Sequence, residues 1–136
     1  MTKVFLDTNV LVYANDKRDE KKQLTAIELV ADCMRDQTGV VSTQVLQEYA
    51  VVAVGKLRQD LDVVIRQLTL IESLEVVQIT PELVRRGLEI QARYRISYWD
   101  AAILAAAEHA RCSLLWSEDL DEGTLYGTIR VENPFR

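Results

Sequence analysis

Short apolar runs alternate along the chain with longer segments whose apolar residues recur at helical spacing. The first run is Val4, Phe5 and Leu6, which are consecutive rather than alternating with polar residues. This pattern is typical of a strand covered on both faces, as in a parallel sheet. Further short runs predict strands at residues 40–41, 76–79, 113–116 and 129–131.

The intervals between the first four runs predict helices, at residues 10–13, 24–34, 43–55, 61–74, 81–94 and 101–110. Helix starts are marked by Ser42 with Thr43 and by Thr80-Pro81-Glu82. Apolar faces are expected at Ile27, Val30, Ala31 and Met34, at Val45, Leu46, Tyr49, Ala50 and Ala53, and at Leu61, Val64, Ile65, Leu68 and Ile71. Alternating strands and helices predict an α/β fold with a mostly parallel sheet, in one domain over residues 1–136.

The composition limits how the chain could meet a nucleic acid. Hydrophobic residues make up 49% and charged residues 27%, as in ordinary soluble domains, and the formal net charge is -5. A protein that binds nucleic acid by general positive charge should be basic. Contact with phosphate would therefore depend on bound cations or on local patches, such as residues 15–22 or the helix face with Arg86 and Arg93. Both patches are also consistent with plain solvated surface.

The sequence lacks the features of exported or membrane proteins. Cys33 and Cys112 have no CxxC partner, which indicates small buried residues in a reducing cytosol. No apolar run approaches the roughly 18 residues of a membrane span. Only the short apolar run from Val4 to Leu6 precedes the first acid, so no signal peptide is expected. We expect a cytoplasmic protein without membrane contact.

Acidic residues occur where the predicted strands end. Asp7 directly follows the first strand, Glu48 lies about one turn into the helix after the second, and Asp119 follows the fourth. Asp100 begins the helix at residues 101–110. Ligands of open parallel sheets bind beyond the carboxyl ends of the strands. These four acids are therefore expected to meet at one edge of the sheet.

Three of the four acids also have an ordinary structural explanation. Asp7 could cap the helix that follows it, and Ser97 with Asp100 has the spacing of a capping box. The acidic run at residues 118–122 has the composition of a solvated turn, and within it Asp121 could share or replace the role of Asp119. His109 has no second histidine at ligand spacing and is expected at the surface or as a cap.

If the four acids do meet, they require a cation. Two carboxylates about 4 Å apart repel by roughly 4 kcal/mol at an effective dielectric near 20. Oxygen ligands without a histidine or cysteine cluster favour Mg²⁺ or Mn²⁺ over zinc. A cation held in this way can activate a water and neutralise charge on a phosphodiester during its hydrolysis.

Four short motifs occur in order over nearly the whole chain. They are Val-Phe-Leu-Asp-Thr-Asn ending at Asn9, Ser-Thr-Gln-Val-Leu-Gln-Glu ending at Glu48, Ser-Tyr-Trp-Asp-Ala-Ala around Asp100 and Ser-Glu-Asp-Leu around Asp119. Asn-Pro-Phe at residues 133–135 follows them. With these motifs the chain resembles PIN-domain ribonucleases, in particular the VapC-like toxins of type II toxin–antitoxin pairs.

The resemblance implies a PIN fold, a three-layer α/β/α sandwich with a mostly parallel central sheet. It also implies Mg²⁺- or Mn²⁺-dependent endonucleolytic cleavage of RNA, a cognate antitoxin that covers the site, and a homodimer. The matching positions are the catalytic, metal-binding acids Asp7, Glu48, Asp100 and Asp119 and the supporting polar residues Thr8, Asn9 and Ser117.

The expected roles of these residues differ. Asp7 and Asp100 are the expected direct metal ligands. Glu48 would bind or position a metal or take a proton through water. Asp119 would hold a second or weaker metal, or a metal-bound water. Tyr98 and Trp99 could stack on a base, although packing in the core is the favoured interpretation of Trp99.

Other functions remain open at this stage. An aspartyl phosphotransferase would use Asp7 as nucleophile, but the second acid that haloacid-dehalogenase-type folds carry two residues later is Asn9 here. A PIN-like module could also bind RNA or a basic peptide without cleaving it. An RNA-processing PIN nuclease outside any toxin–antitoxin pair is the nearest alternative to a toxin.

Overall fold

The computed structural model describes residues 2–136, so Met1 of the predicted domain lies outside the described residues. The elements alternate along the chain in the order β1, α1, α2, β2, α3, α4, β3, α5, α6, β4, β5, β6. The helices are α1 Thr8–Ala14, α2 Glu20–Asp36, α3 Thr43–Gly55, α4 Leu61–Ile71, α5 Pro81–Tyr94 and α6 Tyr98–His109. The strands are β1 Val4–Leu6, β2 Gly39–Ser42, β3 Glu75–Val77, β4 Leu114–Trp116, β5 Leu125–Tyr126 and β6 Ile129–Glu132.

The strands form one sheet in the order β3-β2-β1-β4-β6-β5. Every neighbouring pair is parallel except β5 with β6, which is antiparallel. From β1 the chain first adds strands on one side and then returns to add β4 and β6 on the other. The strand order therefore reverses between β1 and β4, and open α/β sheets bind their ligands at such a switch point, beyond the carboxyl ends of the strands.

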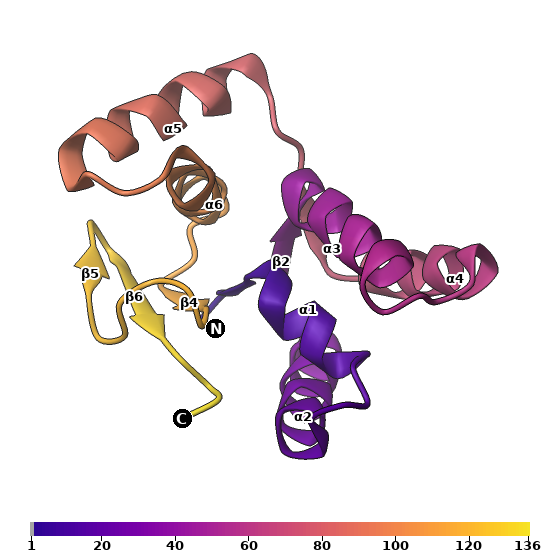
Figure 1. Ribbon diagram of the computed structural model, residues 1–136. Helices are drawn as coiled ribbons and strands as arrows, with labels where there is room; N and C mark the ends of the chain where they lie inside the picture. Colours follow the sequence, from indigo (N-terminus) through magenta and orange to yellow (C-terminus); the bar gives the residue numbers. More distant parts are fainter. Residues whose placement is uncertain (1) are drawn as a thin grey trace.

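Helices cover both faces of the sheet. Figure 1 shows α5 and α6 on one side of the strands and α1 and α2 on the other, with α3 packed beside α1 and α4 beside α3. The predicted α/β sandwich with a mostly parallel sheet is thus confirmed.

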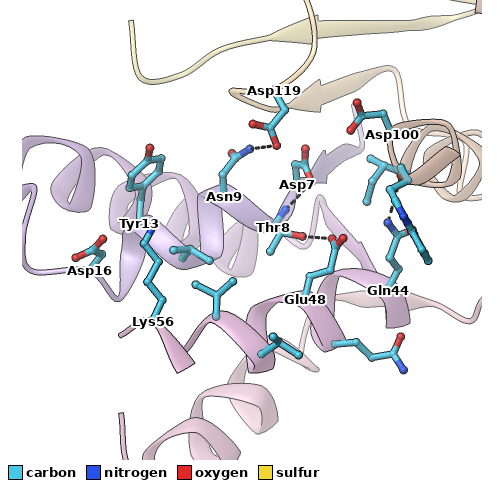
Figure 2. Close-up of a pocket in the computed structure, with 16 residues that line it drawn as sticks. Asp7, Thr8, Asn9, Tyr13, Asp16, Gln44, Glu48, Lys56, Asp100 and Asp119 are labelled. Carbon is cyan, nitrogen blue, oxygen red and sulfur yellow. Dashed lines mark hydrogen bonds between the residues drawn. The ribbon is translucent and has the colours of Figure 1, made fainter. Parts of the chain in front are cut away.

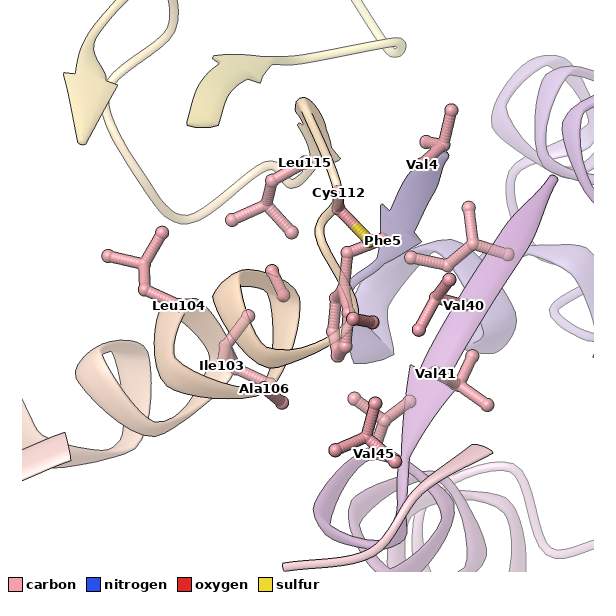
Figure 3. Packing of buried hydrophobic residues seen from close by; sticks show 14 of the residues in the cluster. Val4, Phe5, Val40, Val41, Val45, Ile103, Leu104, Ala106, Cys112 and Leu115 are labelled. Atoms are coloured by element: carbon pink, nitrogen blue, oxygen red, sulfur yellow. The ribbon is translucent and has the colours of Figure 1, made fainter. Parts of the chain in front are cut away.

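The core is built where the alanine-rich α6 lies against the central strands. Residues 101–107 of this helix are all buried, and Phe5 and Leu115 are completely buried on the strands beneath it. Figure 3 shows Phe5 between Ile103 on α6 and Val40 on β2. Small side chains let the helix approach the sheet closely, so the two central strands are held rigidly.

Several details of the sequence prediction need correction. The fourth helix ends at Ile71, not at Leu74, which is buried in the turn that leads to β3. The third strand occupies Glu75–Val77 instead of residues 76–79. Strand β5 was not predicted, because it has only two residues and is defined by a tight turn at Gly127, where φ is +60°. Apolar periodicity alone does not mark these ends.

Some predicted apolar faces are not buried. Ile27, Leu61 and Ile65 are exposed, whereas α2 instead buries Ala26 and Cys33 against the sheet. The inward residues Val45, Tyr49 and Ala53 of α3 are confirmed. Both cysteines are buried and free, and His109 is exposed at the end of α6, as expected. Within residues 2–136, no helix has both the length and the hydropathy needed to cross a membrane.

The close packing of β2 yields a first prediction. A methyl group at Gly39 would lie 2.8 Å from Cys33 Cβ and 2.9 Å from Leu74 Cδ2. We expect Gly39→Ala to lower the free energy of unfolding in urea by about 1–3 kcal/mol, because both neighbours are buried and must shift. Gly55→Ala is the matched control, since nothing lies within 4 Å of its added methyl group. The control should be neutral or stabilising by up to about 1 kcal/mol, and equal losses in the two variants would contradict the packing argument.

Candidate functional site

Asp7 lies at the carboxyl end of the central strand β1 and is 4% exposed. Its side chain caps α1 by accepting a hydrogen bond from the Thr8 backbone N–H at 2.7 Å through Oδ1. The second oxygen, Oδ2, accepts a hydrogen bond of 2.6 Å from Ser117 Oγ. The capping and functional interpretations of Asp7 therefore do not exclude each other, because the cap fixes the carboxylate at the strand end.

Ser117 connects Asp7 to the loop after β4. It directly follows that strand, is completely buried, and its backbone N–H donates to the Glu132 carbonyl at 3.0 Å. Its Oγ also accepts a hydrogen bond of 3.1 Å from the Asp119 backbone N–H. One hydroxyl thus links the ends of β1 and β4 on either side of the switch point.

Thr8 and Asn9, the other two predicted supporting residues, each form a hydrogen bond with one of the acids. Thr8 Oγ1 donates to Glu48 Oε1 at 2.6 Å, which joins the start of α1 to α3. Asn9 Nδ2 donates to Asp119 Oδ2 at 3.3 Å. Asn9 Oδ1 is buried and is among the few buried side-chain atoms of residues 2–136 without a hydrogen-bond partner.

Thr8, Asn9 and the four acids line one pocket of about 670 Å³. Figure 2 shows Asp7, Glu48, Asp100 and Asp119 around its opening, with Lys56 toward the other end. The structure therefore brings the four predicted acids to a single cavity. Asp121 is exposed and does not line it.

Asp100 enters the pocket from the first turn of α6. Ser97 caps this helix, since its Oγ accepts a hydrogen bond of 3.1 Å from the Asp100 backbone N–H. The neighbouring Trp99 also lines the pocket and is 63% exposed. The expectation that Trp99 packs in the core was therefore wrong: the helix turns residues 101–107 toward the sheet and leaves its first turn at the surface.

The pocket concentrates negative charge. Burial raises the pKa of Asp7 to about 6, and the charges of Asp119 and Glu48 act in the same direction against the hydrogen bonds from Ser117 and Thr8. The pKa of Asp100 is also raised, mainly by burial. No ion pair within the described part of the chain involves any of the four acids. Hydrogen bonds reach Asp7, Glu48 and Asp119, but no cationic side chain of the described residues is paired with the four acids.

The donor set fits a hard divalent cation. The four acids offer carboxylate oxygens, Asn9 adds an unpartnered amide oxygen, and neither histidine nor cysteine is among the residues that line the pocket. Among residues 2–136, no three acidic, histidine or cysteine side chains already stand at the spacing of a preformed metal cage. Mg²⁺ does not need one, because it commonly keeps several waters and takes only one or two carboxylates directly.

A second network beside the pocket was missed by the sequence analysis. Tyr13 Oη donates to Glu118 Oε1 at 2.6 Å, and Lys22 Nζ donates to Glu118 Oε2 at 2.8 Å. Burial would raise the pKa of Glu118, but these hydrogen bonds outweigh it and the pKa is lowered. The ring of Tyr13 also packs edge-on against Phe135, with centroids 4.8 Å apart. This network ties the Asp119 loop to α1, α2 and the last residues of the chain.

The two basic regions considered in the sequence are partly neutralised. Arg18 forms hydrogen bonds of 2.8 and 2.9 Å to the buried carboxylate of Asp16, so the segment at residues 15–22 is not simply solvated. On the α5 face, Arg86 donates to both carboxylate oxygens of Glu108, at 2.8 and 2.9 Å.

Comparison with protein families gives a match over most of the chain. The model of the PIN domain matches residues 4–123. This range includes β1, the four acids and the three supporting polar residues. No match was found among curated proteins.

Solved structures share the fold at low sequence identity. VapC20 from Mycobacterium tuberculosis, described as a Sarcin-Ricin loop cleaving toxin, has a TM-score of 0.68 and 19% identity, covering 88% of this chain and 92% of that chain. A toxin–antitoxin complex from Klebsiella pneumoniae has a TM-score of 0.68 and 18% identity, with coverage of 97% and 98%. DNA-bound VapBC from Salmonella typhimurium has a TM-score of 0.66 and 20% identity, with coverage of 98% and 99%.

The burial of Asp7 predicts how stability depends on pH when a chelator removes all metal. The pKa rises from 3.8 to about 6 on folding, so the folded protein keeps a proton that the unfolded chain releases between these values. The free energy of unfolding should therefore fall as pH rises through this window and stay lower above it, by up to about 3 kcal/mol.

Urea unfolding at a series of pH values checks this expectation. In Asp7→Asn, most of the decline in the free energy of unfolding between about pH 4 and about pH 7 should be absent, because an amide does not titrate. Asp121→Asn is the matched control and should keep the wild-type dependence, since Asp121 is exposed and outside the pocket. Parallel curves for the wild type and Asp7→Asn would contradict the burial argument.

Proposed function

The chain belongs to the PIN domain family, and from that premise we propose that it is a divalent-metal-dependent endoribonuclease that hydrolyses phosphodiester bonds in RNA. The observation that carries the proposal is the set of four acids around one pocket, with no cationic side chain paired to any of them among residues 2–136. Such a set is costly unless a cation binds there.

In this proposal Asp7 and Asp100 are the direct ligands of Mg²⁺ or Mn²⁺. Asp119 would hold a second or weaker metal, or a metal-bound water, and Glu48 would bind or position a metal or accept a proton through water. When bound, the cation would lower the pKa of a water and neutralise charge that develops on the phosphate.

The supporting residues orient these carboxylates. Ser117 Oγ and the Thr8 N–H bind the two oxygens of Asp7, so its orientation is fixed before substrate arrives. Thr8 Oγ1 holds Glu48 at Oε1, and Asn9 contacts Asp119. Removal of such outer partners typically costs about 10- to 100-fold in metal affinity or activity.

We further propose that the protein acts as the toxin of a toxin–antitoxin pair, with a cognate antitoxin and a second copy of the chain as partners. Similar structures include toxin–antitoxin complexes from Klebsiella pneumoniae and Salmonella typhimurium. The pocket has an apolar part with Val12, Val51 and Val52, and Val51 is 72% exposed. A partner segment with apolar and basic side chains would match this mixture of apolar and acidic surface.

The test is cleavage of RNA by purified protein freed of any bound partner. We expect cleavage with added Mg²⁺ or Mn²⁺ and none in excess EDTA. Asp7→Asn should lower the cleavage rate by more than the roughly 100-fold that an outer partner typically contributes, because it removes a ligand charge. Asp121→Asn carries the same chemical change outside the pocket and should cleave like the wild type.

Two results would overturn the nuclease proposal. One is undiminished cleavage in EDTA, and the other is equal activity of Asp7→Asn and the wild type. RNA that binds tightly but is never cleaved at any metal concentration would favour a binding module instead. Co-expression with the product of an adjacent small reading frame tests the proposed antitoxin. That product should suppress the activity of this protein.

A further inference from the structure

Trp99 is an exposed aromatic side chain at the edge of the acidic pocket. The residue is 63% exposed although it is the second residue of α6, a helix in which residues 101–107 are all buried. It immediately precedes Asp100 and lines the same cavity as the four acids. A large indole left in water beside a site for a polyanion requires an explanation other than packing.

Neighbouring residues hold the backbone and the indole ring of Trp99 in place. Gln44, itself only 7% exposed, donates from Nε2 to the Trp99 carbonyl at 3.2 Å. The ring of Tyr98 meets the indole edge-on, with centroids 5.2 Å apart and an interplanar angle of 75°. Tyr98 in turn lies against α5, since a methyl group at Gly87 would be 3.0 Å from Tyr98 Cε1. The indole therefore stands on a rigid support with its surface open.

We propose that Trp99 is a stacking platform for a nucleobase of the RNA, next to the phosphate that is cleaved. This inference rests on the proposed nuclease function and adds a binding determinant to it. The acids repel the phosphate backbone and the net charge is -5, so affinity near the cut cannot come from general positive charge. Stacking of a base on an aromatic ring contributes about 1–3 kcal/mol whatever the base. An aromatic face beside Asp100 supplies this attraction without positive charge.

The aromatic face of Trp99 determines which class of RNA the site favours. Every base has an aromatic face, so stacking favours an unpaired nucleotide over a paired one without reading its identity. The substrate class is therefore RNA with at least one unstacked base at the cleaved position, in a loop, a bulge or a single strand.

The kinetic test compares Trp99→Ala with Trp99→Phe on a single-stranded RNA whose cleaved bond has been mapped. Trp99→Ala should raise KM about 5- to 150-fold, the equivalent of one stacked base, and change kcat little. Trp99→Phe should retain most of the affinity. Unfolding in urea should be nearly unchanged in both, because the ring is largely exposed.

An RNA that lacks a single base tests which nucleotide stacks on Trp99. Replacing the base beside the cleaved phosphate with an abasic site should weaken binding to the wild type by a similar factor and should not weaken binding to Trp99→Ala further. Fluorescence gives a second readout: in a Trp116→Phe background Trp99 is the remaining tryptophan, and added RNA should quench it while the abasic RNA should not.

Three outcomes would overturn the inference while leaving the nuclease intact. They are additive losses from Trp99→Ala and the abasic site, unchanged fluorescence on saturation with RNA, and conversion of a dimer to a monomer by Trp99→Ala with activity lost in proportion. The last would assign the indole to an interface between copies. Absence of cleavage by the wild type under every metal condition would instead refute the underlying function.

Discussion

Asp7, at the carboxyl end of the central strand β1, is buried, and no cationic side chain among residues 2–136 forms an ion pair with it. Asp7 keeps two hydrogen bonds, from Ser117 and from the start of α1, yet burial still raises its pKa to about 6. An ionised group in that position lowers stability at neutral pH. The sheet tolerates it because Phe5 and Leu6 on the same strand are completely buried. In the proposed nuclease, a bound cation offsets this cost, so stability and chemistry are coupled through one side chain.

The alternation of strands and helices made the fold predictable, because both faces of the central strand β1 are apolar and its neighbours show the same pattern. The positions of Asp7, Glu48 and Asp119 at one pocket could be anticipated for a related reason: carboxyl ends of parallel strands face one edge. What the acids bind stays a prediction, since placement around a pocket does not test ligation.

The local sequence pattern predicted burial and contacts wrongly where they depend on segments distant in the sequence. Leu61 and Ile65 have the spacing of a buried face, but no part of the sheet lies against them and they are exposed. Glu118 looked like one more solvated acid, yet Tyr13 and Lys22, 105 and 96 residues away, bind both its oxygens. Trp99 was expected in the core, but it is 63% exposed. The first turn of a helix can extend past the sheet, and spacing within the helix does not reveal this.

The connection between Asp7 and Ser117 also constrains the order of events during synthesis. Strand β1 is made early, but it lies between β2 and β4, and the hydroxyl that orients Asp7 belongs to a residue 110 positions later. Contacts so distant in sequence form late, because the chain between them must first be ordered. A nascent chain on the ribosome therefore lacks the complete site until the segment after β4 has been added and has folded. In the proposed nuclease, topology alone therefore withholds the complete site from the partly made protein.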